Sequence, residues 1–337
     1  MESIVENWGI LGHEWAVNLL RGHIANGKLR HAYLFTGPAG TGRRTLALHL
    51  AQAVNCTRPP APGDFCGECR ACRLIARMEH PDLTIVQSEQ AGKMLKVEQI
   101  RGLQRALSLA PYEARYKAAL LLRFEEANPS AANALLKTLE EPPPQVIMLM
   151  TASNGEALLP TILSRCEVIR LRPLSIGKLS AGLQTRWGLP QPEAELLAHL
   201  SGGRPGYALN LHGSPEVLAQ RQAWLDDHRR LLAASRAERF AYAATLAKDR
   251  AALNAALHTW LTLWRDVMLR AANSAVPLTN LDRTDEIEFL AGTVELPAAK
   301  SMVSHLETAI EQNSRYINAR LLTEVLMLDL PKCKQML

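Results

Sequence analysis

The stretch that decides the fold runs from residue 31 to residue 45 and reads His31-Ala-Tyr-Leu-Phe-Thr-Gly-Pro-Ala-Gly-Thr-Gly-Arg-Arg-Thr45. Its first part, 31–36, is a short apolar run that predicts a buried strand. A Gly-rich turn at 37–42 follows, and then an expected helix through about Val54. This strand–turn–helix context is the one that a phosphate-binding loop requires, so the stretch predicts a P-loop-type α/β domain.

Strands and helices alternate on both sides of this stretch. Short apolar runs predict four further strands, at 82–87, 118–122, 146–150 and 168–171. Apolar residues at helical spacing predict three further helices, at 11–27, 97–107 and 130–140. Such an alternation implies a parallel sheet with helices on both of its faces.

The pattern changes at Pro173. No convincing strand follows, and 173–208 holds short helices that prolines and glycines interrupt. From 209 onward the chain reads as helical, with Leu, Ala and Trp residues three to four apart that are typical of a helical-bundle core. We therefore expect an α/β domain at 1–172, a small helical part at 173–208 and an all-helical domain at 209–337.

Length and composition fit this division. The 337 residues suggest two or three domains. With 21% charged and 47% hydrophobic residues, the composition excludes a disordered, collagen-like or coiled-coil chain. No window approaches 18 uninterrupted apolar residues, and no basic stretch precedes an apolar core at the N-terminus. We therefore expect no membrane association and a cytoplasmic protein. The net charge of +5 is too small to indicate nucleic-acid binding by itself.

Four of the six cysteines, Cys56, Cys66, Cys69 and Cys72, fall within one short stretch with the spacing C-x9-C-x2-C-x2-C. A reducing cytoplasm disfavours disulfides, and four thiolates at this spacing can surround one tetrahedral zinc ion. Four protein ligands would leave the metal no open position, so its role would be structural. The alternatives are an iron–sulfur cluster, whose usual run ends in C-x3-C-P, and four unrelated free thiols.

The phosphate loop departs from its motif. Gly37, Gly40 and Gly42 let backbone N–H groups face an anion, but the positions usual for Lys and then Ser or Thr hold Arg43 and Arg44, and Thr45 comes one residue late. An arginine keeps the charge without the lysine geometry, and Arg44 cannot ligate Mg²⁺. The loop either binds phosphate without normal magnesium chemistry or is a fold element retained without turnover.

A second part of an ATP-hydrolysing site is also off its pattern. Such a site needs an acidic pair at the end of a central strand. The strand at 118–122 is followed by Arg123 and Phe124 before Glu125 and Glu126. These glutamates either serve as the acids or begin a solvated helix. Two independent departures together favour a chain that does not hydrolyse ATP.

The order of the motifs resembles the bacterial clamp-loader ATPase family of the AAA+ class. The motifs are His31-Ala-Tyr-Leu-Phe35, the cysteine stretch 56–72, His80-Pro-Asp-Leu83, Val97-Glu-Gln-Ile-Arg101, Ala132-Asn-Ala-Leu-Leu-Lys-Thr-Leu-Glu-Glu-Pro-Pro143, Leu163-Ser-Arg-Cys166, Gly202-Gly-Arg-Pro-Gly206 and Asn318-Ala-Arg-Leu-Leu322. The resemblance covers nearly the whole chain and is weakest between about 210 and 310. It implies an ATPase-like domain, a helical lid and a helical collar that joins subunits into a hetero-pentameric ring.

The resemblance also implies roles for single residues. Arg165, in Ser-Arg-Cys, would reach ATP bound on a neighbouring subunit as an arginine finger; the alternative is a surface salt bridge. Arg204 matches the family's lid arginine that senses nucleotide on the same chain. The nucleotide itself, ATP, would contact the set Gly37, Gly40, Gly42, Arg43, Arg44, Thr45 and Arg204. Thr151, Ser153 and Asn154 lie where the family has its polar sensor.

The two departures favour the delta-prime branch of the family over its gamma/tau motor branch, which would carry Gly-Lys-Thr and an Asp-Glu pair. The expected function is help in loading the sliding clamp onto primed DNA within the DNA polymerase III holoenzyme, with little or no ATPase activity of its own. The implied partners are gamma/tau-like and delta-like subunits and, through the complex, the clamp and primer–template DNA. The alternatives are an ATP-hydrolysing gamma/tau-like motor, and a zinc-dependent nucleic-acid binder that uses Arg58, Arg70, Arg73 and Arg77.

Overall fold

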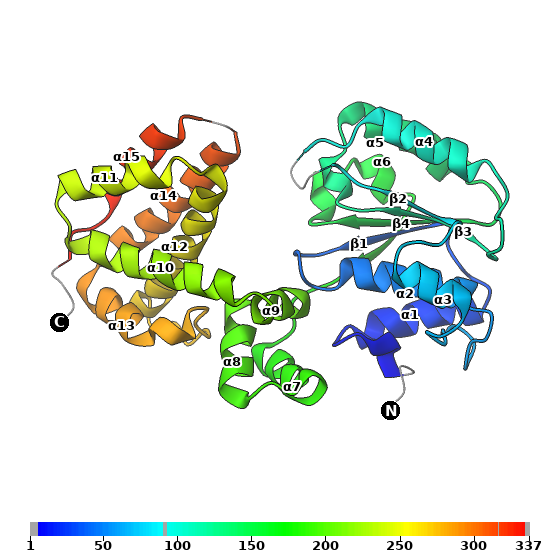
Figure 1. Ribbon diagram of the computed structural model, residues 1–337, viewed down its shortest axis with the longest axis horizontal. Coiled ribbons are helices and arrows are strands. Elements are labelled where there is room, and N and C mark those ends of the chain that lie inside the picture. The colour runs from blue at the N-terminus through cyan, green and yellow to red at the C-terminus, as the bar shows by residue number, and fades with distance from the viewer. Residues whose placement is uncertain (1–5, 90–92, 316, 334–337) are drawn as a thin grey trace. The chain divides into compact units, whose positions relative to one another are not determined.

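The computed structural model describes residues 6–89, 93–315 and 317–333 (Figure 1). The chain forms two compact units. One contains Met1–Gly182 with Arg204–Tyr207, and the other contains Leu183–Gly203 with Ala208–Leu337. The expected division into three parts, with boundaries at 173 and 209, remains a prediction, because the structure groups the chain into two units.

The first unit contains a five-stranded sheet in which every neighbouring pair is parallel. In sheet order the strands are β2 (Leu83–Val86), β3 (Lys117–Leu121), β4 (Val146–Ala152), β1 (Ala32–Thr36) and β5 (Glu167–Arg170). All five expected strands are confirmed, each to within two residues at either end. Buried parallel strands are apolar on both faces, which is why short apolar runs predicted them.

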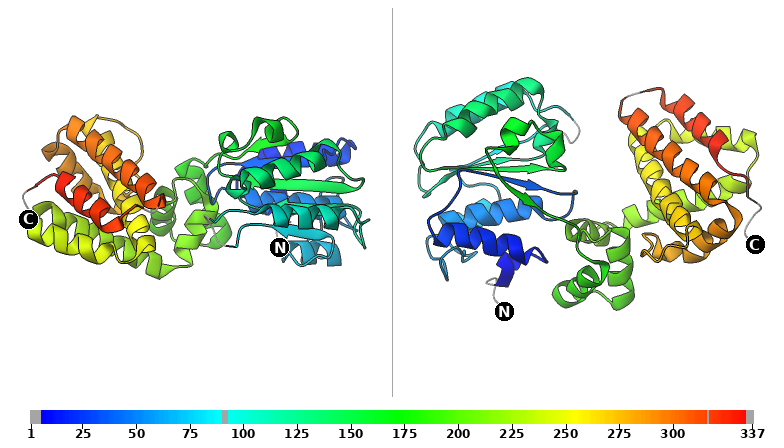
Figure 2. Two further views of the ribbon diagram at one scale, coloured as in Figure 1. Left: turned by 90° about the horizontal axis from the view of Figure 1, so that it is seen from above. Right: turned by 180° about the vertical axis from the view of Figure 1, so that it is seen from behind.

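Helices cover both faces of this sheet, as expected (Figures 1 and 2). Alternate residues of a strand face opposite sides, so Tyr33 and Phe35 of β1 enter one core and Ala32 and Leu34 enter the other. The helices over the first face are α1 (Glu14–Ala25), α2 (Arg43–Asn55) and α3 (Arg70–Ala76). Those over the second face are α4 (Val97–Leu107), α5 (Pro129–Glu140) and α6 (Pro160–Leu163).

Three helical elements differ from expectation, one of which is the short helix α6, which was not expected. The helix expected at 11–27 begins only at Glu14, because Gly12 and His13 have φ of +76° and +59°, outside the helical range. Helix α3 was not expected, because at seven residues it is too short to show a helical period beside the cysteine spacing. Its buried Cys72 and Ile75 face the first core.

No strand follows β5 in the described part of the chain. The remaining helices are α7 (Ile176–Trp187), α8 (Gln191–Leu200), α9 (Pro205–His212), α10 (Pro215–Ala233), α11 (Arg236–Leu246), α12 (Arg250–Ala271), α13 (Thr284–Thr293), α14 (Leu296–Ser314) and α15 (Ala319–Asp329). Trp260 and Trp264 are buried in the core of the second unit, which confirms their interpretation as bundle core. None of the described helices has the length and hydropathy that a membrane-crossing segment needs.

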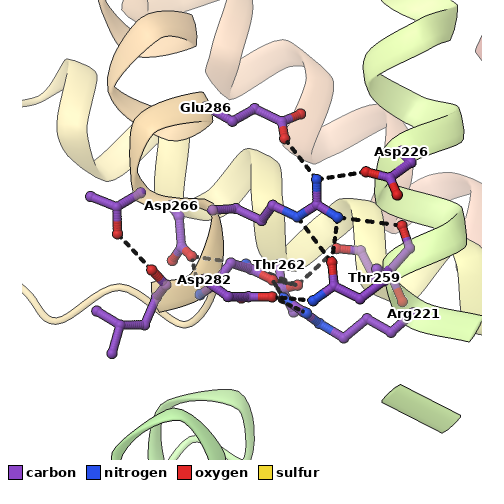
Figure 3. Close-up of polar contacts among 12 residues, drawn as sticks. Arg221, Asp226, Thr259, Thr262, Asp266, Asp282 and Glu286 are labelled. Carbon is purple, nitrogen blue, oxygen red and sulfur yellow. Dashed lines mark hydrogen bonds and ion pairs between the residues drawn. The ribbon is translucent and has the colours of Figure 1, made fainter. Parts of the chain in front are cut away.

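A buried carboxylate fixes the turn between α12 and α13 (Figure 3). Asp266 is 1% exposed and accepts hydrogen bonds from the backbone N–H groups of Thr279 (3.0 Å) and Asn280 (2.8 Å). The side chain of Asn280 in turn accepts a hydrogen bond from Arg221 of α10 (2.6 Å), and Arg221 also pairs with Asp282 through both of its terminal nitrogens. One carboxylate therefore connects α12 to the turn and, through Asn280, to α10.

We expect Asp266→Ala to lower the free energy of unfolding of the second unit by about 3 kcal/mol, because it leaves buried N–H donors without acceptors. Urea unfolding followed by tryptophan fluorescence would measure the change. Asp285→Ala, which removes an exposed carboxylate of α13, is the matched control and should change stability by less than about 0.5 kcal/mol. Equal losses in the two variants would contradict this account.

Candidate functional site

The four clustered cysteines converge in space. Their sulfur atoms all lie within 4.8 Å of one another, and the Sγ atoms of Cys56 and Cys66 are 3.6 Å apart. Cys56 directly follows the last residue of α2, and Cys69 is the N-cap of α3, so two helix ends bring the thiols together. The expected clustering of Cys56, Cys66, Cys69 and Cys72 is confirmed.

The donor set fits a tetrahedral metal ion. With metal–sulfur bonds of about 2.3 Å, the sulfurs of such a site lie about 3.8 Å apart. The backbone N–H groups of Cys66 and Cys69 each point at the sulfur of the preceding cysteine of the set, at 3.3 Å. Burial opposes ionisation of Cys69, but hydrogen bonds from Cys72 and Thr57 lower the pKa of its thiol to about 6. Burial raises the pKa of Cys72, so a bound cation would be needed to ionise the whole set at neutral pH.

The loop between Cys56 and Cys66 has a second anchor that the sequence analysis missed. Asp64 is buried and accepts hydrogen bonds from the indole N–H of Trp8 (3.0 Å) and from Nε of Arg21 (2.6 Å). The neighbouring Phe65 packs edge-on against Trp8, with ring centroids 6.1 Å apart. No sequence signal marked this contact, because its partners lie more than 40 residues away along the chain.

The phosphate loop connects β1 to α2, as the sequence predicted. Gly37, Gly40 and Gly42 have φ of +142°, +85° and +99°, values that other residues rarely adopt. The chain's own segment 204–207 packs on this loop. The N–H of Gly206 donates to the carbonyl of Gly40 at 2.8 Å, and a Cβ on Gly40 would lie 2.8 Å from the backbone nitrogen of Tyr207.

The residues that follow the glycines differ in exposure. Arg44 and Thr45 are exposed in the first turn of α2. Arg43 is half-buried, and its Nη1 has no hydrogen-bond partner among the described residues, so it offers an unused donor that suits a phosphate. Burial lowers the pKa of Arg43, while the nearby charge of Glu125 opposes this shift. The buried Oε2 of Glu125 also lacks a partner, and its negative charge disfavours a phosphate beside Arg43.

The two glutamates after β3 point to different partners. Oε1 of Glu125 accepts a hydrogen bond from the backbone N–H of Ser153 at 2.9 Å. Glu126 instead forms an ion pair with Arg123, 3.0 Å away, and accepts a hydrogen bond from Ser88. Both are half-buried rather than solvated. The two glutamates are therefore held by different groups in this structure.

Thr151 and Asn154 at the end of β4 both have structural partners. The hydroxyl of Thr151 accepts a hydrogen bond from the backbone N–H of Arg123 (3.0 Å), and Asn154 caps the 3₁₀ turn Gly155–Ala157. Arg204 lies 4.6 Å above the ring centroid of Tyr207, in the segment that contacts the phosphate loop.

Arg165 and the phosphate loop lie at opposite ends of the parallel strands. Arg165 lies near the N-terminal ends, and the loop lies at the C-terminal ends. The arginine comes two residues before β5, which starts at Glu167 opposite Tyr33 of β1. The loop begins four residues after Tyr33, at Gly37. About 13 Å of strand therefore separates the start of the loop from the start of β5. Nη2 of Arg165 pairs with Oε1 of Glu140 at 2.7 Å, and its side chain is 34% exposed. The neighbouring Cys166 is partly buried against the core, and burial raises the pKa of its thiol to about 12.

Comparisons with known proteins agree with this architecture. The family model of the DNA polymerase III delta subunit matches residues 12–175. The chain is 42% identical over 205 residues to the DNA polymerase III subunit delta-prime of Pseudomonas aeruginosa, covering 60% of this chain and 61% of that one. It is 37% identical over 158 residues to the delta-prime subunit of Bacillus subtilis, covering 47% of each. It is 34% identical over 179 residues to the tau subunit of Salmonella typhimurium, covering 52% of this chain and 27% of that one.

The family-model match at 12–175 contains the parallel sheet, the cysteine cluster and Arg165. The matched stretches span 61% and 47% of the two delta-prime relatives. Both delta-prime relatives are more similar to the chain than the tau relative is. The chain is thus similar to the delta-prime subunits of bacterial DNA polymerase III, of which it spans about half to three fifths.

Proposed function

We propose that the chain is a non-hydrolysing member of the clamp-loader ring that lends Arg165 to ATP bound by a neighbouring gamma/tau-like subunit. The observation that carries this proposal is that Arg165 and the chain's own phosphate loop lie at opposite ends of the parallel strands. A guanidinium at position 165 is unable to reach a phosphate in the loop of the same chain. In a dry interface it would stabilise charge on the γ-phosphoryl group of another subunit.

The state of the chain's own loop supports the same function. The position that usually holds the Ser or Thr ligand of Mg²⁺ is Arg44, and the hydroxyl of Thr45 comes one residue later. Glu126 forms an ion pair with Arg123. In this proposal Gly37, Gly40, Gly42, Arg43 and Arg204 keep the shape of a nucleotide site without its chemistry. The chain works with gamma/tau-like and delta-like subunits in a pentameric ring, and the ring places the sliding clamp on primer–template DNA for DNA polymerase III.

We further propose that Cys56, Cys66, Cys69 and Cys72 hold a structural zinc ion. When bound, zinc would supply four bonds that fix the end of α2 to the start of α3, and no chemistry on a substrate. The four converging sulfurs and the N–H groups that point at them support this proposal.

Arg165→Ala should lower the DNA-stimulated ATPase activity of a reconstituted clamp loader, by about 10³-fold at the site that receives this arginine. Steady-state turnover of the assembled ring measures the loss. Arg172→Ala, at an exposed arginine with no ion pair among the described residues, is the matched control and should leave turnover unchanged. Full activity of the Arg165→Ala ring would refute the proposed donation.

The alternative is a gamma/tau-like motor, which the unpartnered donor of Arg43 and the similarity to tau favour. Isothermal titration of the isolated chain with Mg-ATP separates the two functions. We expect no micromolar binding and no hydrolysis, because the site lacks a Mg²⁺ hydroxyl ligand and an adjacent acidic pair. Micromolar binding with hydrolysis that Arg43→Ala abolishes would support the motor instead.

Metal analysis tests the zinc proposal. The purified chain should contain one zinc ion, and Cys69→Ser should lose it, because a tetrahedral site needs all four ligands. Chelation should make residues 57–68 sensitive to protease, since metal bonds no longer close that loop. The variants Cys166→Ser and Cys333→Ser are controls that keep the metal. Iron with visible absorbance would point to the iron–sulfur alternative.

A further inference from the structure

Glu140 occupies a position where a carboxylate is locally unfavourable. It is the last residue of α5, and its side chain is 51% exposed. The C-terminal end of a helix carries partial negative charge, which repels an anion. Neither the core nor the helix itself therefore explains a glutamate here. The explanation that the structure offers is the guanidinium of Arg165, 2.7 Å from Oε1.

The guanidinium of Arg165 is held by its own chain along one side. Nη1 donates to the carbonyl of Thr161 at 2.8 Å and to the hydroxyl of Ser164 at 3.3 Å, and Nη2 donates to Glu140. Arginine has five N–H donors. Among the described residues, Nε–H and one N–H of Nη2 have no acceptor, so they remain available to a partner outside this chain.

Glu140 differs from the other two acceptors in its origin. Thr161 and Ser164 lie within four residues of Arg165, and Thr161 belongs to α6, whose Ile162 is buried in the core. Glu140 comes from α5, which packs against the sheet through its buried Leu135 and Leu139. Glu140 is thus the one charged acceptor among the three, and it is the one that comes from a distant part of the chain.

We propose that Glu140 is a positioning residue, which holds the guanidinium of Arg165 so that its two free N–H donors face the phosphate of the neighbouring subunit. This inference rests on the proposed function of Arg165. A long arginine side chain loses rotamer freedom when it engages a ligand, and a contact that fixes it beforehand removes that cost from the reacting complex. Because the ion pair is half-exposed, it contributes little to folding stability, so variants of Glu140 should fold and assemble.

The test uses a reconstituted ring in which only the motor subunit next to this chain keeps the lysine of its phosphate loop. We expect Glu140→Ala to lower kcat for ATP about tenfold, with KM for ATP within about twofold, since the substrate pocket itself is untouched. Glu140→Gln keeps an oxygen acceptor at the same place and should restore kcat to within about threefold of the unchanged ring. Glu141→Ala, at the exposed neighbouring glutamate, is the matched control and should have no effect.

The outcomes separate this inference from the proposed function. An Arg165→Ala ring that is inactive beside a Glu140→Ala ring at full or higher kcat would overturn the role of Glu140 and leave the donated arginine in place. A Glu140→Gln ring as slow as the Glu140→Ala ring would also overturn positioning through an acceptor. An Arg165→Ala ring with full activity would remove the proposed function, and this inference with it.

Discussion

Strands β1 and β5 pair in parallel, from Tyr33 opposite Glu167 to Thr36 opposite Arg170. Because the two strands run in the same direction, the phosphate loop, which follows β1, and Arg165, which precedes β5, lie at opposite ends of the strands. The backbone at residue 165 and the start of the loop are therefore separated by about the length of a strand. The proposed division between a chain that lends a cation and a neighbour that binds the nucleotide rests on this strand direction.

Side-chain contacts then determine what each end can do. At the loop end, Glu125 lies near Arg43, Glu126 pairs with Arg123, and the carbonyl of Gly40 is engaged by the chain itself. At the other end of the strands, the guanidinium of Arg165 donates to the carbonyl of Thr161 and to Glu140, and it keeps further N–H donors unused among the described residues. At the loop, Nη1 of Arg43 and Oε2 of Glu125 likewise keep unused hydrogen-bonding capacity in the described part of the chain.

The sequence predicted the sheet well because each buried parallel strand is a continuous apolar run bounded by polar residues. It also predicted the cysteine cluster, since closely spaced thiols converge whatever the exact loop path. It did not predict the anchor at Asp64 or the pair between Glu140 and Arg165. Both join residues at least 25 positions apart, and they depend on how α1, α5 and α6 pack. Likewise, the positive φ of Arg123 (+50°), which precedes the divergent Glu125 and Glu126, left no mark in the residue pattern.

Helix α2 joins two regions that the sequence treats separately. It begins at Arg43, directly after the phosphate loop, and ends at Asn55, directly before the first cysteine of the cluster. Its 13 residues span about 20 Å, and its inner side is packed into the core along most of this length. Because α2 is one continuous helix packed into the core, it sets the spacing between Cys56 at one end and Arg43 at the other. The thiol cluster and the anion loop are thus the two ends of a single structural element.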